Sequence, residues 1–282
     1  LTAKKAEDRG SKYGHNRILC DDTTDCSELF TEALVNAGFL SAQTMSLNAF
    51  YKHLLLDYLE DDVHRAFETF SNYGMSPRCI NPEELNELYL STPSMTVLST
   101  HCGNWELLGG VFAYLDASGV PYSFGQNDMK VVYKKLSSPV WDEVFKINRT
   151  APLNKNEDQC VIESSNILRY AITHRNEKKI YCYPADQAPY SKAGKHFIGE
   201  FMNQPTNAMQ GSVGVASKLS HSVLYLKMKR VKRGQYEWTL IPICEDASKS
   251  TPEELLRKYY DLLEEEIRET PSNWLWSHKR WK

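Results

Sequence analysis

Residues 95–117 read MTVLSTHCGNWELLGGVFAYLDA, and this stretch carries the clearest fold signal of the chain. Its first six residues are mostly apolar or β-branched, which favours a short buried strand. The chain then turns at Gly103, and Asn104 is a good N-cap residue for the helical pattern that follows. Because a strand that leads directly into a helix is the repeating unit of parallel sheets, this stretch predicts an α/β fold.

The alternation of strands and helices continues along the chain. Further strands are expected at 120–125, 179–184, 222–231 and 235–243, the last two joined as a hairpin through Arg233-Gly234. Helices are expected at about 136–147, 158–175, 206–220 and 251–269, the last of them beginning at the start signal TPEE. These elements predict a mostly parallel central sheet with an antiparallel edge, flanked by helices.

The N-terminal part of the chain has a different character. Residues 1–27 are polar and read as irregular, and a helix is expected at 27–38. Residues 46–60 place their apolar side chains on one helical stripe, which favours a helix packed on the core over one lying on a membrane. We therefore expect an N-terminal polar and helical segment at 1–44, followed by the main domain at 45–282.

The composition is that of an ordinary globular protein. The chain has 282 residues, of which 41% are apolar and 24% charged. The net charge of −3 gives no general attraction to nucleic acid. No run approaches the roughly 20 apolar residues that a membrane-spanning helix needs, and no signal peptide is visible.

Seven cysteines are scattered through the chain, at positions 20, 26, 79, 102, 160, 182 and 244. Their odd number and the absence of a C-x-x-C pair argue against a disulfide framework and a structural zinc site. We expect free thiols in a reducing cytoplasm and no metal.

His101 and Glu106 are the candidate catalytic residues. His101 is expected at the carboxyl end of a strand, where parallel sheets bind ligands, and Glu106 in the first turn of the next helix. A carboxylate that holds the imidazole makes a general base for an attacking hydroxyl or amine. The alternative is a histidine that caps the sheet edge. Cys102 is disfavoured as a nucleophile, because it would point to the opposite face of an extended segment.

Four segments together resemble one protein family. HCGNWE (101–106) resembles the H-x-G-N-W-E box of the bacterial lipid A biosynthesis acyltransferases of the lauroyl/myristoyl type, within the lysophospholipid acyltransferase superfamily. VVYKKLSSPVWDEVFKINRT (131–150), IYCYPADQAP (180–189) and PSNWLWSHKRWK (271–282) resemble further boxes of that family, in the same order. The resemblance covers about residues 45–282.

The resemblance implies a fold and an activity. The fold would be glycerol-3-phosphate-acyltransferase-like, with N-terminal helices beside the sheet. The enzyme would move a fatty acyl group from acyl-carrier protein or acyl-CoA, without another cofactor, to a lipid hydroxyl or amine, most readily that of a lipid A precursor. It would work in peripheral contact with the membrane, at the cytoplasmic face of the bacterial inner membrane.

The resemblance also implies roles for individual residues. His101 would be the base and Glu106 its partner in an H-x4-E dyad. Asp186 and Gln187 would shape the same pocket from the next strand end, and Asn104 would contact substrate.

Two basic residues complete the implied site. Arg149 would hold a headgroup phosphate or polarise the thioester carbonyl, with Lys134 nearby. Lys134 stands where the family commonly has arginine, and a lysine lacks the bidentate fork that binds phosphate. Residues 1–44 also lack the hydrophobic anchor that is usual in the family.

The sequence is also compatible with two other functions, and two surface segments each have two possible interpretations. A thioesterase could use the same dyad on water, and a lipid-binding protein could keep the fold without catalysis. The basic run 227–233, KMKRVKR, is a solvated strand face or a contact for anionic lipid. The tail 274–282, WLWSHKRWK, either lies at a membrane interface or docks on the domain with Trp274 and Trp276 buried, and we favour docking.

Overall fold

The computed structural model describes residues 78–150, 153, 160–189, 195–232, 235–278 and 280–281. The helices expected at 27–38 and 46–60, the segment 1–44 and the Arg233-Gly234 turn lie outside these residues.

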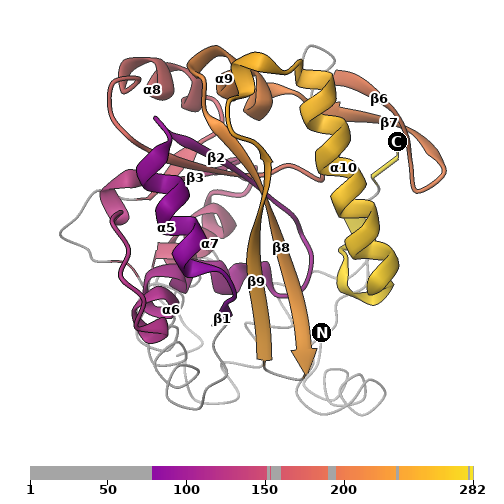
Figure 1. The fold of residues 1–282 in the computed structure, drawn as a ribbon. Helices are drawn as coiled ribbons and strands as arrows, with labels where there is room; N and C mark the ends of the chain where they lie inside the picture. Colours follow the sequence, from indigo (N-terminus) through magenta and orange to yellow (C-terminus); the bar gives the residue numbers. More distant parts are fainter. Residues whose placement is uncertain are drawn as a thin grey trace, which may run out of the picture. The chain divides into compact units, whose positions relative to one another are not determined.

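A seven-stranded sheet forms the centre of the described part of the chain (Figure 1). Its order is β1-β9-β8-β2-β5-β3-β4, and every pair except β8–β9 is parallel. The mostly parallel α/β fold is thus confirmed. The strands are β1 (Arg78–Cys79), β2 (Met95–Ser99), β3 (Met129–Tyr133), β4 (Val161–Glu163), β5 (Ile180–Pro184), β8 (Ser222–Lys232) and β9 (Gln235–Cys244).

Helices cover both faces of this sheet. One group comprises α5 (Pro82–Ser91), the 3₁₀ helix η1 (Trp105–Gly110), α6 (Val111–Ser118) and α7 (Pro139–Thr150). The other comprises α8 (Ile167–Thr173), α9 (Gly211–Leu219) and α10 (Pro252–Glu269), beside the separate hairpin β6 (Lys195–Phe201) and β7 (Gln204–Met209) (Figure 1). Short 3₁₀ turns complete the described part: η2 (Gln126–Asp128), η4 (Ala247–Lys249), η5 (Pro271–Asn273) and η6 (Trp276–His278).

The start of α10 shows how local sequence fixes a helix boundary. The Thr251 hydroxyl accepts a hydrogen bond from the backbone N–H of Glu254, and the Glu254 carboxylate accepts one from the N–H of Thr251. This reciprocal capping box, followed by Pro252, satisfies N–H groups that have no partner inside the helix. The predicted helix at 251–269 is therefore confirmed almost to the residue.

Other expected elements were wrong or incomplete. Residues 120–125 form no strand; Tyr122 and Phe124 instead pack their rings against Phe112 of α6. The strand of that region is β3, a few residues further on. The helix expected at 158–175 begins only after the short strand β4, and the one expected at 206–220 begins only after β7. Apolar runs this short do not distinguish a strand from a buried helix.

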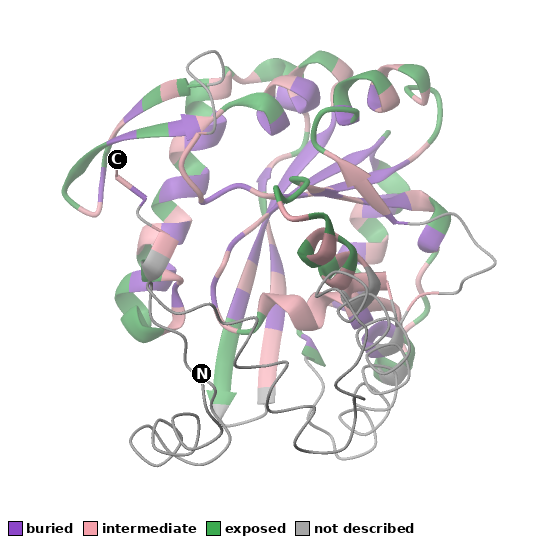
Figure 2. Ribbon diagram, turned by 180° about the vertical axis from the view of Figure 1, so that it is seen from behind, coloured by how far each residue is buried: buried purple, intermediate pink, exposed green. Residues whose placement is uncertain are grey.

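Two apolar cores lie on the two faces of the sheet. The first joins α8, α9 and α10 to the sheet and includes Tyr225, Tyr259 and Tyr260, each with 0% of its surface exposed. The second joins α5 and α6 to the opposite face. Figure 2 shows buried residues running along the central strands between these helix layers. No helix within the described ranges is both long and apolar enough to cross a bilayer.

Candidate active site

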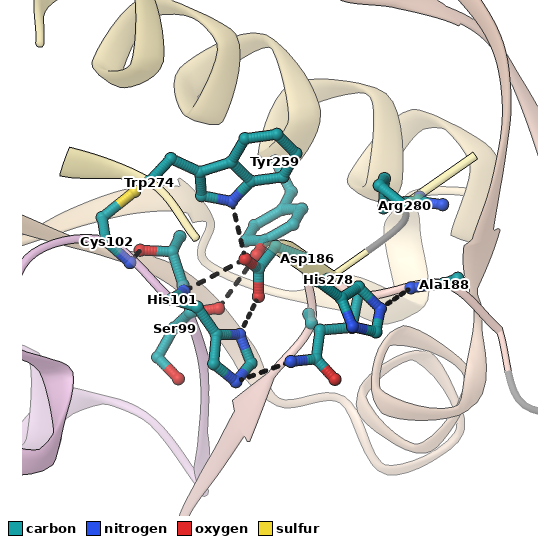
Figure 3. Close-up of polar contacts among 12 residues, drawn as sticks. Ser99, His101, Cys102, Asp186, Ala188, Tyr259, Trp274, His278 and Arg280 are labelled. Atoms are coloured by element: carbon teal, nitrogen blue, oxygen red, sulfur yellow. Dashed lines mark hydrogen bonds and ion pairs between the residues drawn. The ribbon is translucent and has the colours of Figure 1, made fainter. Parts of the chain in front are cut away.

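The pairing of β2 with β5 brings His101 and Asp186 together. Their register places Ser99 opposite Pro184, the last residues of the two strands. His101 and Asp186 each follow two residues later, so they meet at the carboxyl edge of the sheet. His101 Nδ1 lies 2.6 Å from Asp186 Oδ1, and the backbone N–H of His101 donates to Oδ2 at 3.1 Å (Figure 3).

Asp186 is a buried carboxylate that its neighbours keep ionised. Its side chain is 2% exposed, and burial by itself raises its pKa. Hydrogen bonds and charge from His101, together with a 2.9 Å bond from the indole N–H of Trp274, outweigh this and hold the pKa of Asp186 below its usual value. An ionised Asp186 accepts from Nδ1–H, and this fixes the tautomer with Nε2 as the basic nitrogen of the neutral ring.

The His101 ring lines a large cavity. Gln187 Nε2 lies 3.1 Å from His101 Nε2, and both side chains belong to the cavity wall. The cavity has a volume of about 1160 Å³, above the roughly 300–1,000 Å³ of ordinary small-molecule sites. Its inner wall is apolar and includes Val97, Phe124 and Leu226. Such a space suits a long apolar chain.

Glu106 does not hold His101, contrary to the expected dyad. Its carboxylate accepts two hydrogen bonds from Arg149 of α7, one from Nε at 3.0 Å and one from Nη2 at 2.8 Å. These bonds raise the pKa of Arg149. Gly109 allows the close approach, because a Cβ there would lie 3.2 Å from the backbone oxygen of Arg149. The carboxylate that holds His101 is therefore Asp186, from the neighbouring strand end. Glu106 instead forms a bidentate ion pair with Arg149.

The other expected site residues are placed as follows. Lys134 and Arg149 both line the cavity, with Lys134 exposed just after β3. Asn104 occupies the N-cap position of η1 as expected, but it makes no side-chain cap, is exposed and is not part of the cavity wall.

One family accounts for the motifs. Its sequence model, described as bacterial lipid A biosynthesis acyltransferase, matches residues 32–282. The chain belongs to this family. A search of curated proteins found no match. Membership confirms the resemblance on the four motifs and identifies the protein as an acyltransferase of lipid A biosynthesis.

The family's C-terminal motif forms backbone hydrogen bonds with the histidine motif. The N–H of Gly103 donates to the oxygen of Asn273 at 2.8 Å, and the N–H of Leu275 donates to the oxygen of His101 at 3.2 Å. This antiparallel bridge requires the turn at Gly103, whose φ of +61° is in the left-handed region that favours glycine. Two family boxes about 170 residues apart therefore form one structure.

The tail docks on the domain, as favoured, but only in part. Trp274 is 5% exposed, whereas Trp276 is 48% exposed, so the expected burial of Trp276 was wrong. Trp276 instead packs against the edge of Trp274 and donates its indole N–H to the oxygen of Pro271 at the surface.

Two tyrosines of α10 hold the strand ends from behind. The Tyr259 hydroxyl donates to the oxygen of Ser99 at 2.9 Å, and the Tyr260 hydroxyl donates to that of Ala185 at 3.1 Å. These carbonyls lie just before His101 and Asp186 in the chain. The tyrosines therefore fix the backbone that carries His101 and Asp186.

Cys102 faces away from the cavity, as the alternation of an extended segment predicts. Its side chain is buried among the α10 core residues, and burial raises the pKa of its thiol well above the usual value. A thiol that stays protonated is a poor nucleophile. In the described ranges no group of histidine, cysteine and carboxylate side chains could hold a metal ion.

Sequence reasoning missed Trp274, His278 and Arg280 as site residues. All three belong to the family's C-terminal box, for which the sequence alone predicted no site residue. Trp274 bonds Asp186, while His278 and Arg280 line the cavity. Their repeated aromatic and basic character was the available signal.

Proposed function

We propose that the protein transfers a fatty acyl group from a thioester donor to a hydroxyl, or an amine, of a lipid A precursor or related lipid, with His101 as general base. One observation carries this proposal: the imidazole lines an apolar cavity, and its Nδ1 is held at 2.6 Å by the buried carboxylate of Asp186. A base that a carboxylate orients, and that opens on an apolar cavity, suits proton abstraction beside a bound acyl chain.

The reaction needs no covalent intermediate on the protein. The acceptor hydroxyl gives its proton to Nε2 of His101 while its oxygen attacks the thioester carbonyl carbon, displacing the Gln187 amide that lies 3.1 Å from that nitrogen. The tetrahedral oxyanion collapses with cleavage of the C–S bond. The leaving thiolate then takes the proton from the imidazolium, so the ester forms and the base is restored.

Arg149 would stabilise the oxyanion, and Glu106 would position Arg149. A fixed cation at the rim of a water-poor site stabilises developing negative charge strongly. The two hydrogen bonds from Arg149 to Glu106, at 3.0 and 2.8 Å, hold the guanidinium in one orientation. In this proposal the family's H-x4-E residues act as a base and a positioning residue, and the carboxylate of the base is Asp186.

The cavity favours transfer over hydrolysis. Burial of an acyl chain contributes about 0.8 kcal/mol per methylene and keeps water away from the thioester. The donor would be acyl-carrier protein or acyl-CoA, which both present the acyl group on a thiol arm.

Peripheral contact with the cytoplasmic face of the membrane would bring the lipid acceptor to the cavity mouth. Leu136, Trp141 and Phe145, on and just before α7, are 41%, 48% and 37% exposed. Lys134 and Lys135 precede them in the chain and line the cavity. Exposed aromatic rings next to cations suit a lipid headgroup layer.

The test is acyl transfer from labelled acyl-carrier protein and acyl-CoA into a lipid extract that contains lipid A precursors. Products are read by mass spectrometry for wild type, His101→Ala, Asp186→Asn and Glu106→Gln, with His174→Ala as a histidine control outside the site. We expect a loss of at least about 10²-fold for His101→Ala and of about 10²- to 10⁴-fold for Asp186→Asn. The control should match wild type.

Three results would contradict the proposal. Free fatty acid in place of an acylated lipid would identify a thioesterase. Lipid binding without turnover would identify a non-catalytic protein. Full activity of Asp186→Asn together with loss of activity in Glu106→Gln would show that Glu106, and not Asp186, is the carboxylate that supports His101.

A further inference from the structure

We propose that Arg280 forms a phosphate-binding subsite, which holds a phosphate group of an amphiphilic substrate beside His101. The inference rests on the proposed function, because it assigns the polar end of the substrate to a particular part of the same cavity. It gives Arg280 a role that differs from the one expected of Arg149.

Arg280 is a buried cation without a carboxylate. The residue is 5% exposed and lines the cavity. Its Nη2 donates to the oxygen of Asn207 at 2.6 Å and to the Tyr260 hydroxyl at 2.9 Å, while Nε and Nη1 make no hydrogen bond to a described residue. No described carboxylate lies within 4.0 Å of the guanidinium. Burying a charge in this way is costly unless an anion joins it.

The charged side chains of the cavity wall are mostly basic. The described residues of its wall include five Lys or Arg side chains, Lys134, Lys135, Arg149, Lys195 and Arg280, and a single carboxylate, Glu106. That carboxylate accepts two hydrogen bonds from Arg149, and Arg280 has no described carboxylate within 4.0 Å. Several positive charges facing one space match a multiply charged anion, which phosphate is.

Arg280 and His101 line the same cavity, and the segment that carries Arg280 contacts the residue after Gln187. Gln187 contacts His101 Nε2, and the N–H of the next residue, Ala188, donates to His278 Nε2 at 3.1 Å. His278 and Arg280 belong to the same segment. Figure 3 shows both on the opposite side of Asp186 from Cys102. A phosphate held there would keep the polar end of the substrate in the cavity that His101 lines and leave the apolar part of that cavity for the acyl chain.

Guanidinium geometry favours phosphate as the ligand. The planar fork of arginine binds two phosphate oxygens at once, whereas lysine acts as a point charge. Two substrates could bring this group: the headgroup of a phosphorylated lipid acceptor, or the phosphate-bearing carrier arm of the thioester donor. The chemistry of recognition is the same in both cases, so the experiment must separate them.

The experiment compares wild type with Arg280→Gln and Arg280→Lys, and with Arg175→Gln, which removes an exposed arginine outside the cavity. Each is assayed with a phosphorylated acceptor and with the same acceptor after phosphatase treatment. Each is also assayed with acyl-CoA and with an acyl-N-acetylcysteamine thioester, which carries no phosphate. The measured quantity is the ratio of kcat/KM with and without the phosphate.

We expect wild type to prefer the phosphorylated substrate about 10- to 100-fold, the range of a charge-assisted pair. Arg280→Gln should bring this ratio close to one, Arg280→Lys should lie between, and Arg175→Gln should equal wild type. If the acceptor ratio falls, the phosphate is the acceptor's; if only the donor ratio falls, it is the donor's. A ratio that is unchanged in Arg280→Gln overturns the proposal, since a purely structural arginine affects both substrates alike.

Binding provides a readout that does not depend on turnover. Detergent micelles that contain the phosphorylated or the dephosphorylated acceptor are titrated against each variant, with Arg280→Lys as the main variant if Arg280→Gln does not fold. Phosphate-dependent binding that Arg280→Lys weakens supports the subsite, whether or not acyl transfer is seen. Such binding without any acyl transfer would contradict the proposed function but not the subsite. Equal binding of both lipids by wild type and variant overturns the subsite.

Discussion

The two faces of the central sheet are built for different tasks. On the α10 face, aromatic rings fill the space: Tyr259 and Tyr260 pack edge to face at 5.0 Å, and Trp274 packs against Phe201 at 5.9 Å. The α6 face has its own apolar core but also borders the cavity of about 1160 Å³, whose wall continues at the strand ends to the β6–β7 hairpin and the C-terminal tail. Both faces meet at the strand ends that carry His101 and Asp186.

The difference shows how one fold can hold His101 in a fixed position and still leave a cavity in front of it. The packed face holds the backbone next to His101 and Asp186, because its tyrosine hydroxyls donate hydrogen bonds to the oxygens of Ser99 and Ala185. The hollow face leaves space in front of the imidazole. A close-packed interior resists distortion, so the catalytic geometry can be kept without contacts from the substrate side.

The buried carboxylate of Glu266 gives the packed face a pH dependence of its own. Burial raises the pKa of Glu266 to about 7, although hydrogen bonds from Tyr225 and from the N–H of Met228 oppose the rise. Because its folded pKa lies above its unfolded value, Glu266 contributes stability below the unfolded pKa, and this is lost as pH rises to about 7. The loss is up to about 3 kcal/mol.

Glu266→Gln should remove this part of the pH dependence. Urea unfolding at pH 5 and pH 8 would show a smaller fall in unfolding free energy for Glu266→Gln than for wild type. Exposed Glu265→Gln is the neighbouring control and should behave as wild type. The same pH dependence in all three proteins would refute the assignment.

A matched pair of valines tests the contrast in packing directly. Val97 lines the cavity and Val213 of α9 is 0% exposed in the packed core. Val213→Phe should cost about 1–3 kcal/mol of stability, because a filled core cannot take the added volume. Val97→Phe should leave stability nearly unchanged.

Val97→Phe should instead change the choice of acyl chain. Each methylene that no longer fits costs about 0.8 kcal/mol, or about fourfold in kcat/KM. Thermal unfolding and a series of acyl donors of increasing length measure the two effects. Equal stability losses in the two variants would show that the faces are packed alike.

The smallest effect is expected at the tyrosine hydroxyls. Tyr259→Phe removes the bond to Ser99 and should cost about 1 kcal/mol of stability, with a modest loss of kcat because His101 is less firmly held. Tyr183→Phe is the control, since its buried hydroxyl bonds no described residue. Unfolding curves and kcat should separate the two variants; indistinguishable behaviour would mean that the hydroxyl of Tyr259 positions nothing.

Local signals predicted the elements whose boundaries depend on neighbouring residues. The strand before His101, the turn at Gly103 and the capping box at Thr251 were read correctly, because their causes lie within a few residues in the chain. The aromatic segment 120–125 was misread as a strand. Its rings pack on α6, and only the packing decides this.

The site residues divide in the same way. The presence of His101, Arg149 and Gln187 at one cavity was anticipated from the family's boxes, whereas Asp186 is buried behind His101 and is not part of the cavity wall. The sequence did not predict which carboxylate bonds His101 and which bonds Arg149, because this pairing depends on distances between segments far apart in sequence. Glu106 is five residues from His101 yet bonds Arg149, while Asp186 is 85 residues away and bonds the imidazole.

The sequence by itself determined the α/β class, the family, and the histidine motif at the end of a strand. It could do so because strand, turn and helix preferences and motif spacing are local properties. Only the tertiary structure decided the carboxylate partner of His101 and brought Arg280 to the cavity. Strand register and the antiparallel bridge between Cys102 and Trp274 fix those contacts, and both arise from long-range pairing that no single segment encodes.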